Sequence, residues 1–170
     1  MVARGTEGFL PSVPFRLDLL RHGEALPAAA DGDSARRLSP SGRATIASLA
    51  ERFAREGWRP DALWASPLAR AQETASILAA VACPGTLIGI LEALVPDREP
   101  EDVVRALAEV RPRGHVVLVG HQPLLGRLAA YLSGGRESGF PAGGLVRLEM
   151  EDGLGRGVGK VVLQLRPDPV

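Results

Sequence analysis

The sequence predicts a single α/β domain with a mostly parallel central sheet, helices on both faces of that sheet, and partly antiparallel strands at the C-terminal end. Short β-prone runs alternate with longer segments of helical periodicity, which is the order that gives parallel sheets. The run HVVLV at His115–Val119 is apolar after its first residue, as in a strand buried on both faces. Leu145–Met150 and Lys160–Leu165 flank a glycine-rich turn and predict an antiparallel hairpin.

The first elements are expected to be a strand, a long loop and a helix. Phe15–Leu20 is short and apolar and predicts the strand, whereas residues 21–38 are polar and rich in glycine and alanine and predict the loop. Ser39 offers an N-cap and Pro40 a first helical position. The helix should end at Gly57 and carry apolar residues at helical spacing, namely Ile46, Leu49, Ala50 and Phe53.

The same kind of helix start recurs in the middle of the chain. The brief apolar run Ala62–Ala65 predicts a buried strand, and Ser66 followed by Pro67 is expected to cap the next helix, Leu68–Val81. The remaining elements are expected to be a strand at Thr86–Leu91, a proline-rich loop at 96–100, a helix at Glu101–Val110 with Val103, Val104, Leu107 and Val110 facing inward, and a helix at Leu124–Leu132.

Some chemically interesting residues are assigned to packing. Asp18 is an unusual residue inside a strand. Cys83 is the only cysteine, so it cannot form an internal disulfide or a multi-thiolate zinc site, and we expect a semi-buried apolar residue. His115 begins a strand and is expected to face solvent without a catalytic role. Trp58 and Trp64 are expected to pack rather than to stack on a ligand.

Length and charge limit what the chain can be. Its 170 residues, 45% of them hydrophobic, are enough for one core and too few for two ordinary domains. A formal net charge of zero argues against nucleic-acid binding and a polybasic membrane contact. We expect residues 1–14 to be a flexible lead-in without a signal peptide, and 15–170 to form the domain. With no membrane-length apolar run, the chain is expected to be cytoplasmic, and its oligomeric state stays open.

Two histidines follow two of the predicted strands. Ligands bind at the carboxyl ends of strands in open α/β sheets, which is where His22 and His121 are expected to lie. Gly23, beside the first histidine, would let the backbone approach a ligand closely. Arg21 precedes that histidine, and Arg70 lies in the first turns of a helix, whose N-terminus attracts anions. Two guanidinium groups and two imidazoles would form a cationic cup suited to a phosphoryl dianion.

Four segments, in consistent order, make the sequence resemble the histidine phosphatase superfamily, which includes the phosphoglycerate mutases. They are Leu20–Ala25 (LRHGEA), Leu38–Gly42 (LSPSG), Ser66–Ala75 (SPLARAQETA) and Gly120–Pro123 (GHQP). The small size, the RHGEA start and the Leu-Val-Pro segment after Glu92 resemble the short SixA branch of phosphohistidine phosphatases. The resemblance implies a phosphoglycerate mutase-like fold without the inserted cap of the mutases.

The resemblance further implies that His22 attacks phosphorus and becomes phosphorylated, before water hydrolyses the intermediate. Arg21, Arg70 and His121 would stabilise the transferring group, and Gly23 would help to bind phosphate; His121 is expected to be cationic when phosphate is bound. No metal and no cofactor are expected. The general acid is left open between Glu92, which follows the third strand as in mutase-like relatives, and Glu24 beside the nucleophile motif.

Three functions remain open. The first is hydrolysis of phosphohistidine on a protein, because an uncapped pocket would admit a residue carried by another chain. The second is hydrolysis of a small sugar or nucleotide phosphomonoester, which expels an alkoxide and therefore needs a general acid. The third is a non-catalytic phosphate-binding module, which the presence of all four core residues disfavours.

Overall fold

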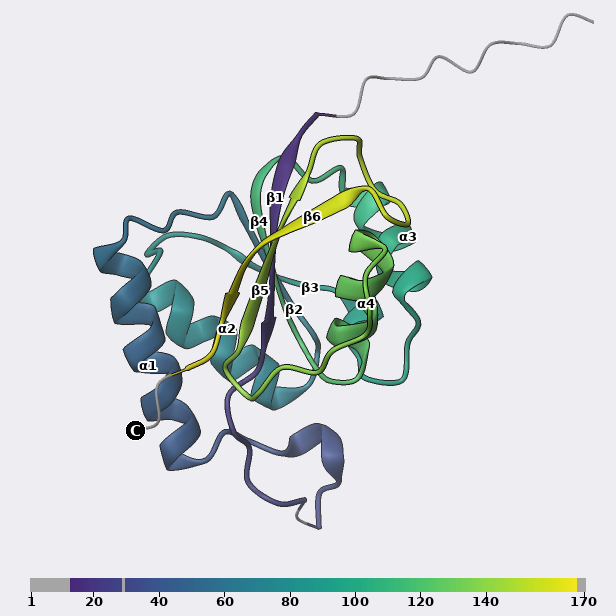
Figure 1. The fold of residues 1–170 in the computed structure, drawn as a ribbon. Helices are drawn as coiled ribbons and strands as arrows, with labels where there is room; N and C mark the ends of the chain where they lie inside the picture. The colour runs from purple at the N-terminus through teal and green to yellow at the C-terminus, as the bar shows by residue number, and fades with distance from the viewer. Residues whose placement is uncertain (1–12, 29, 168–170) are drawn as a thin grey trace, which may run out of the picture.

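The computed structural model describes residues 13–28 and 30–167, and within them the chain forms one six-stranded sheet with two helices on each face (Figure 1). The strands are β1 (Phe15–Arg21), β2 (Ala62–Ala65), β3 (Ile88–Ile90), β4 (Gly114–Gly120), β5 (Leu145–Met150) and β6 (Gly159–Leu165). The helices are α1 (Pro40–Arg55), α2 (Ala69–Val81), α3 (Pro100–Val110) and α4 (Leu124–Ser133), with short 3-10 turns η1 (Asp33–Ala35) and η2 (Glu92–Leu94).

The sheet order is β3-β2-β4-β1-β5-β6. The first four strands in that order are parallel, whereas β5 and β6 run antiparallel to their neighbours. The predicted fold class, including the antiparallel C-terminal hairpin, is therefore confirmed. Residues 1–12 of the predicted lead-in lie outside the described residues, and Val13 and Pro14 are exposed and have no regular structure.

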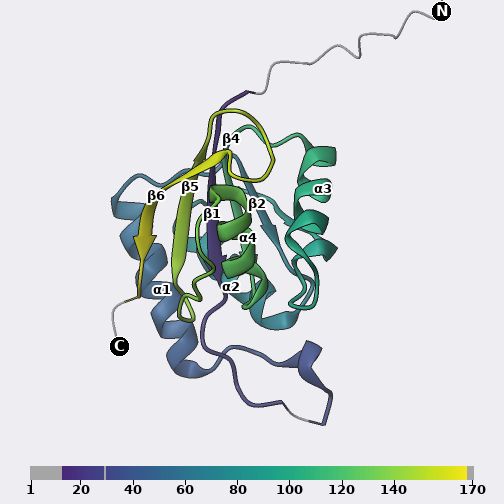
Figure 2. The ribbon, with the colours of Figure 1, turned by 45° about the vertical axis from the view of Figure 1, so that its right-hand side comes forward.

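Strand alternation divides the core into two layers, one on each face of the sheet. Along β1, Leu17 and Leu19 face α3 and α4, whereas Leu20 faces α1 and α2. Figure 2 shows α3 and α4 together on the face opposite α1. Because β1 and β4 are covered on both faces, most of their residues are buried, and their carboxyl ends lie side by side at one edge of the sheet.

The helix boundaries follow local capping chemistry, with some departures from prediction. Ser39 caps α1 as predicted, accepting from the N–H of Gly42 at 2.9 Å, and Gly57 follows the helix at a φ of 70°. Ser66 does not cap α2, whose N-cap position is Leu68, so that prediction is wrong. Helix α3 begins at Pro100, one residue earlier than predicted, because Glu99 and Asp102 form a capping box.

Two of the four side chains predicted to face inward from α3 do not do so fully. Val103 and Leu107 are buried, but Val104 is half-buried and Val110 is exposed. Strand β3 covers only Ile88–Ile90 of the predicted run. The shortening follows from its position at the edge of the sheet, where it pairs with β2 alone.

Asp18 and His115 are partners, so the prediction that His115 faces solvent is wrong. The Asp18 carboxylate is fully buried and accepts hydrogen bonds from His115 Nε2 at 2.8 Å and from Trp58 Nε1 at 2.9 Å. Arg147 on β5 adds a two-point ion pair at 2.6 and 2.8 Å. The unusual acid in β1 is thus the centre of a buried polar network on the α1–α2 face.

The remaining packing predictions are confirmed. Trp58 is buried and stacks on Phe53 with ring centroids 4.8 Å apart, and Trp64 packs against the core on the α3–α4 face. Cys83 is a buried free thiol whose Sγ donates to the carbonyl of Leu78 at 3.7 Å. No helix within residues 13–28 and 30–167 is long and apolar enough to cross a membrane.

Candidate active site

The two predicted histidines meet at one edge of the sheet. Arg21 and Gly120 are register partners at the ends of β1 and β4, so the residues that follow, His22 and His121, lie side by side. Their ring centroids are 4.9 Å apart. The chain after β1 stays bonded to the end of β4, because the N–H of His22 donates to the carbonyl of Gly120 at 3.0 Å. The carboxyl-edge rule for α/β sheets therefore predicted correctly that these two histidines lie together.

His22 is held as a neutral imidazole in one tautomer, with a defined nitrogen that carries the lone pair. Its Nδ1 lies 2.6 Å from the carbonyl oxygen of Gly23, which can only accept, so Nδ1 carries the proton and Nε2 carries the lone pair. Burial lowers the pKa of His22 to about 4, with Arg70 and Arg21 adding to the effect and the Gly23 bond opposing it. At neutral pH the ring is therefore uncharged and can attack an electrophile.

Gly23 is fixed by its neighbours in a close contact with α1. Its N–H donates to Thr74 Oγ1 on α2 at 3.1 Å. A Cβ at this position would lie 2.8 Å from a side-chain carbon of Ile46 and 3.0 Å from the carbonyl oxygen of Gly42. Gly23, which was expected to help to bind phosphate, therefore allows the segment that carries His22 to pack closely against α1.

Arg70 extends from the first turn of α2 into the site, and its side chain is only 5% exposed. Each nitrogen of its guanidinium donates a hydrogen bond. Nε donates to Nε2 of His22 at 3.3 Å, and the two terminal nitrogens donate to the backbone carbonyl and the carboxylate of Asp33 at 2.8 and 3.0 Å. The cation thus contacts the lone pair of His22 directly.

Arg21 and His121 supply polar atoms without partners. Arg21 donates from one terminal nitrogen to the carbonyl of Phe140 at 3.0 Å, and its Nε is buried and unpaired among the described residues. His121 is bonded through Nε2 to the hydroxyl of Ser66 at 2.8 Å, and its Nδ1 is likewise buried and unpaired. Buried polar groups are almost always satisfied, so unpaired buried nitrogens in and beside a histidine pair indicate a ligand site.

The electrostatics of this pair suit an anion. Burial, then His22 and Arg70, lower the pKa of His121 to about 3. Burial also lowers the pKa of Arg21. Both changes express the cost of gathering cationic groups in a protein interior, and a dianion among them would relieve that cost and favour the charged form of His121.

Neither glutamate named as a general acid is held in the cluster. Glu92 is exposed on η2 directly after β3. Glu24 is exposed too, and its carboxylate accepts from the hydroxyl of Ser41 at the start of α1 at 2.6 Å. Within the described part of the chain, no hydrogen bond or ion pair joins either carboxylate to His22 or His121.

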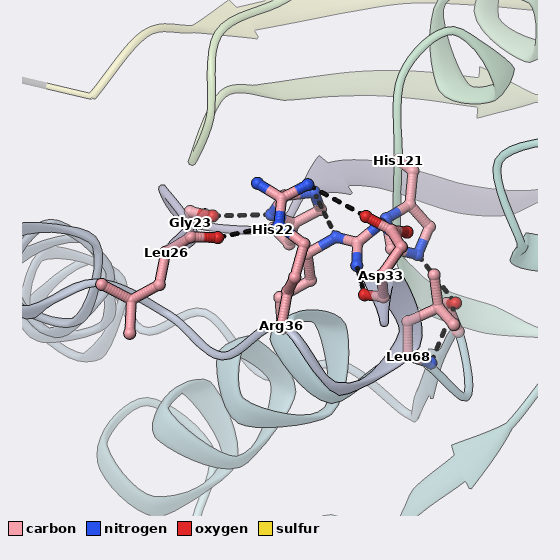
Figure 3. Close-up of polar contacts among 9 residues, drawn as sticks. His22, Gly23, Leu26, Asp33, Arg36, Leu68 and His121 are labelled. Atoms are coloured by element: carbon pink, nitrogen blue, oxygen red, sulfur yellow. Dashed lines mark hydrogen bonds and ion pairs between the residues drawn. The ribbon is translucent and has the colours of Figure 1, made fainter. Parts of the chain in front are cut away.

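Sequence reasoning missed Asp33 and Arg36. Both come from the loop after β1, where Arg36 Nε donates to the carbonyl of Leu26 at 2.7 Å and its NH1 donates to the Asp33 carboxylate at 3.0 Å. Figure 3 shows the Asp33 side chain between Arg36 and His121. An aspartate in a polar loop carries no sequence signal for such a position. Among the described residues, no group of three or more His, Cys, Asp or Glu could hold a metal ion.

Comparisons with known proteins agree on one family. Residues 17–93 match the model of the histidine phosphatase superfamily (branch 1). An uncharacterized protein of Picosynechococcus is 34% identical over 125 residues, which cover 71% of this chain and 74% of that protein.

Solved structures extend the likeness over nearly the whole chain. The protein histidine phosphatase SixA in complex with tungstate superposes with a TM-score of 0.81 at 24% identity, covering 90% of this chain and 97% of that one. A protein assigned as SixA from Agrobacterium tumefaciens gives 0.78 at 28% identity, covering 92% and 100%. A mycobacterial glucosyl-3-phosphoglycerate phosphatase gives 0.66 at 20% identity, covering 88% and 98%.

Proposed function

The chain belongs to the histidine phosphatase superfamily, and on this premise we propose that it removes the phosphoryl group of phosphohistidine from another protein through a covalent intermediate on His22. The observation that carries the proposal is the neutral His22, with Nδ1 on the Gly23 carbonyl and Nε2 turned to Arg70. The enzyme is a phosphatase, and we propose residues 15–170 as the bounds of its domain. Its one free thiol suits the cytoplasm, where cysteines stay reduced.

In the first step, Nε2 of His22 releases Arg70 and attacks phosphorus in line. A bond forms between that nitrogen and phosphorus, the bond to the substrate nitrogen breaks, and its electron pair leaves with the substrate imidazole. Arg21 and Arg70 stabilise the equatorial oxygens, and His121 becomes cationic beside them. In the second step, water attacks the phosphohistidine, inorganic phosphate leaves, and the lone pair of His22 is restored.

The substrate class follows from what the leaving group demands. A phosphomonoester expels an alkoxide and needs a proton, whereas phosphohistidine expels an imidazole, which is a far better leaving group. Glu92 and Glu24 are both exposed and unbonded to the histidine pair, an arrangement that suits the second case. The fold likeness to SixA structures supports the same choice.

The substrate class is tested by comparing kcat/KM for a phosphohistidine-carrying protein with kcat/KM for a panel of phosphomonoesters. We expect phosphohistidine to be preferred by at least about tenfold, because general acid catalysis contributes roughly 10²- to 10⁴-fold where a poor leaving group requires it. Glu92→Gln and Glu24→Gln should leave phosphohistidine hydrolysis nearly unchanged. A preference for one ester, together with a steep loss in either glutamine variant, would instead establish a small-molecule phosphatase with that glutamate as its acid.

Hydrolysis is expected to continue unchanged in the presence of a metal chelator. In the proposed mechanism two guanidinium groups and His121 neutralise the phosphoryl charge, which is the work that magnesium performs in many phosphoryl transferases. The measurement is the rate on p-nitrophenyl phosphate before and after prolonged incubation with EDTA. A large loss that magnesium or zinc restores would show that the cationic cup is not the whole site.

A further inference from the structure

The loop between β1 and α1 places a carboxylate against the cations of the candidate site. Asp33 accepts from Arg70 through both its carboxylate and its backbone carbonyl, at 3.0 and 2.8 Å. Arg36 contacts the other carboxylate oxygen at 3.0 Å. Carboxylate and phosphoryl oxygens are alternative partners for the same guanidinium fork, so Asp33 uses donors of Arg70 that a phosphoryl group needs.

The same carboxylate also acts on the second histidine. The negative charge of Asp33 raises the pKa of His121, against the larger lowering by burial, His22 and Arg70. Asp33 therefore lies close enough to influence both Arg70 and His121, which are the two groups that a bound dianion would neutralise. Figure 3 shows its side chain on the side of the cluster that faces His121.

Asp33 lies on the exposed outer part of the loop, beyond its closed base. The base of the loop is closed, because the N–H of Leu26 donates to the carbonyl of Arg37 at 2.9 Å and the N–H of Leu38 donates to Glu73 of α2 at 2.9 Å. The η1 turn beyond that base buries no side chain. The side chain of Asp33 is 57% exposed, whereas that of Arg70 is 5% exposed. Releasing the carboxylate therefore costs no apolar core.

We propose that Asp33 is an internal counter-ion of the phosphate subsite, which a substrate phosphoryl group must displace from Arg70 before His22 can attack. The inference rests on the proposed function, since it assigns the phosphate to Arg70. Two anions cannot both lie against one guanidinium without strong repulsion, so the phosphoryl dianion takes the position and Asp33 stays paired with Arg36. Displacement also frees the guanidinium to move off Nε2 of His22. The strength of the ion pair between Asp33 and Arg70 therefore sets how tightly an oxyanion must bind Arg70 in order to displace Asp33.

The test measures the affinity of the full-length protein for inorganic phosphate by calorimetry, with Asp33→Asn as the variant. Asparagine keeps the side-chain oxygen and removes the charge, so phosphate should bind roughly two- to fivefold more tightly, the range that a partly exposed ion pair is worth. Asp31→Asn is the matched control, because Asp31 is exposed in the same loop and has no ion pair with any described residue. It should bind phosphate as the wild type does.

The possible outcomes separate the inference from the function on which it rests. Unchanged or weaker phosphate binding by Asp33→Asn, with measurable binding by the wild type, overturns the role of Asp33 alone. Equal tightening by both asparagine variants also overturns it, because the effect is then one of overall charge. If phosphate binding is detected for Asp33→Asn but for neither the wild type nor Asp31→Asn, the inference is supported. If none of the three proteins binds phosphate, both the counter-ion role of Asp33 and the cationic cup as a phosphate site are overturned.

Discussion

Replacing His22 with asparagine is expected to reduce hydrolysis of p-nitrophenyl phosphate and of a phosphohistidine peptide by at least about 10³-fold, because the proposed covalent intermediate forms on this imidazole. The asparagine amide can still donate to the Gly23 carbonyl, which accepts from Nδ1 of His22 at 2.6 Å, so the loop should keep its conformation. The measurement is kcat, with the thermal unfolding temperature as the check on folding. Alanine at the same position should give the same loss.

His121→Asn serves as the matched control for the nucleophile. His121 is as buried as His22 and lies beside it, yet the mechanism assigns it stabilisation and not bond formation. Its loss should slow the reaction by roughly 10²- to 10³-fold while still allowing an acid-labile phosphoenzyme to be trapped. If His22→Asn also yields that phosphoenzyme, or retains turnover, then His22 is not the residue that is phosphorylated.

The residues of the candidate site could be predicted because each lies next to a local signal. His22 and His121 each follow an apolar strand, and a parallel sheet brings such ends to one edge whatever their separation in the chain. Arg70 follows from its place at the start of a helix. The antiparallel C-terminal hairpin and the central position of β4 likewise follow from local patterns, namely two apolar runs around a glycine-rich turn and a nearly continuous β-branched apolar run.

What could not be predicted depends on partners that are distant in the chain. The Ser66–Pro67 pair has the form of a helix start, but the helix begins only at Ala69 and the Ser66 hydroxyl binds His121, 55 residues later. His115 could be judged from sequence only by its position at the start of a strand. Its partner Asp18 is 97 residues away, and no periodicity specifies that contact.

Asp33 shows the same limit within the site itself. Loop composition predicts that a segment lacks regular structure, but it does not predict which way one carboxylate turns. The contact with Arg70 exists because the loop base is closed by Leu26 and Arg37, and this closure depends on tertiary structure. Polar side chains on loops are therefore the residues for which the structure adds most to the sequence.

Asp18→Ala should be the most destabilising single substitution among the polar residues of the fold, lowering the free energy of unfolding by roughly 3–5 kcal/mol. The change leaves the ring of His115, the indole N–H of Trp58 and the guanidinium of Arg147 without their common acceptor in a buried region. The measurement is urea unfolding at neutral pH. Asp97→Asn, at an exposed aspartate, is the control and should change stability by less than about 0.5 kcal/mol.

The pH dependence of this stability has a defined sign. Burial alone would raise the pKa of Asp18, but hydrogen bonds from Arg147, His115 and Trp58 outweigh it and lower the pKa from 3.8 to about 2. The carboxylate therefore stabilises the fold fully above about pH 4, and that contribution is lost as the pH falls toward 2, where the folded state also takes up the proton. The stability difference between wild type and Asp18→Ala should accordingly shrink as acid is added. If the stability difference stays constant from pH 5 to about pH 2, Asp18 stabilises the fold through packing and hydrogen-bond geometry and not through its negative charge.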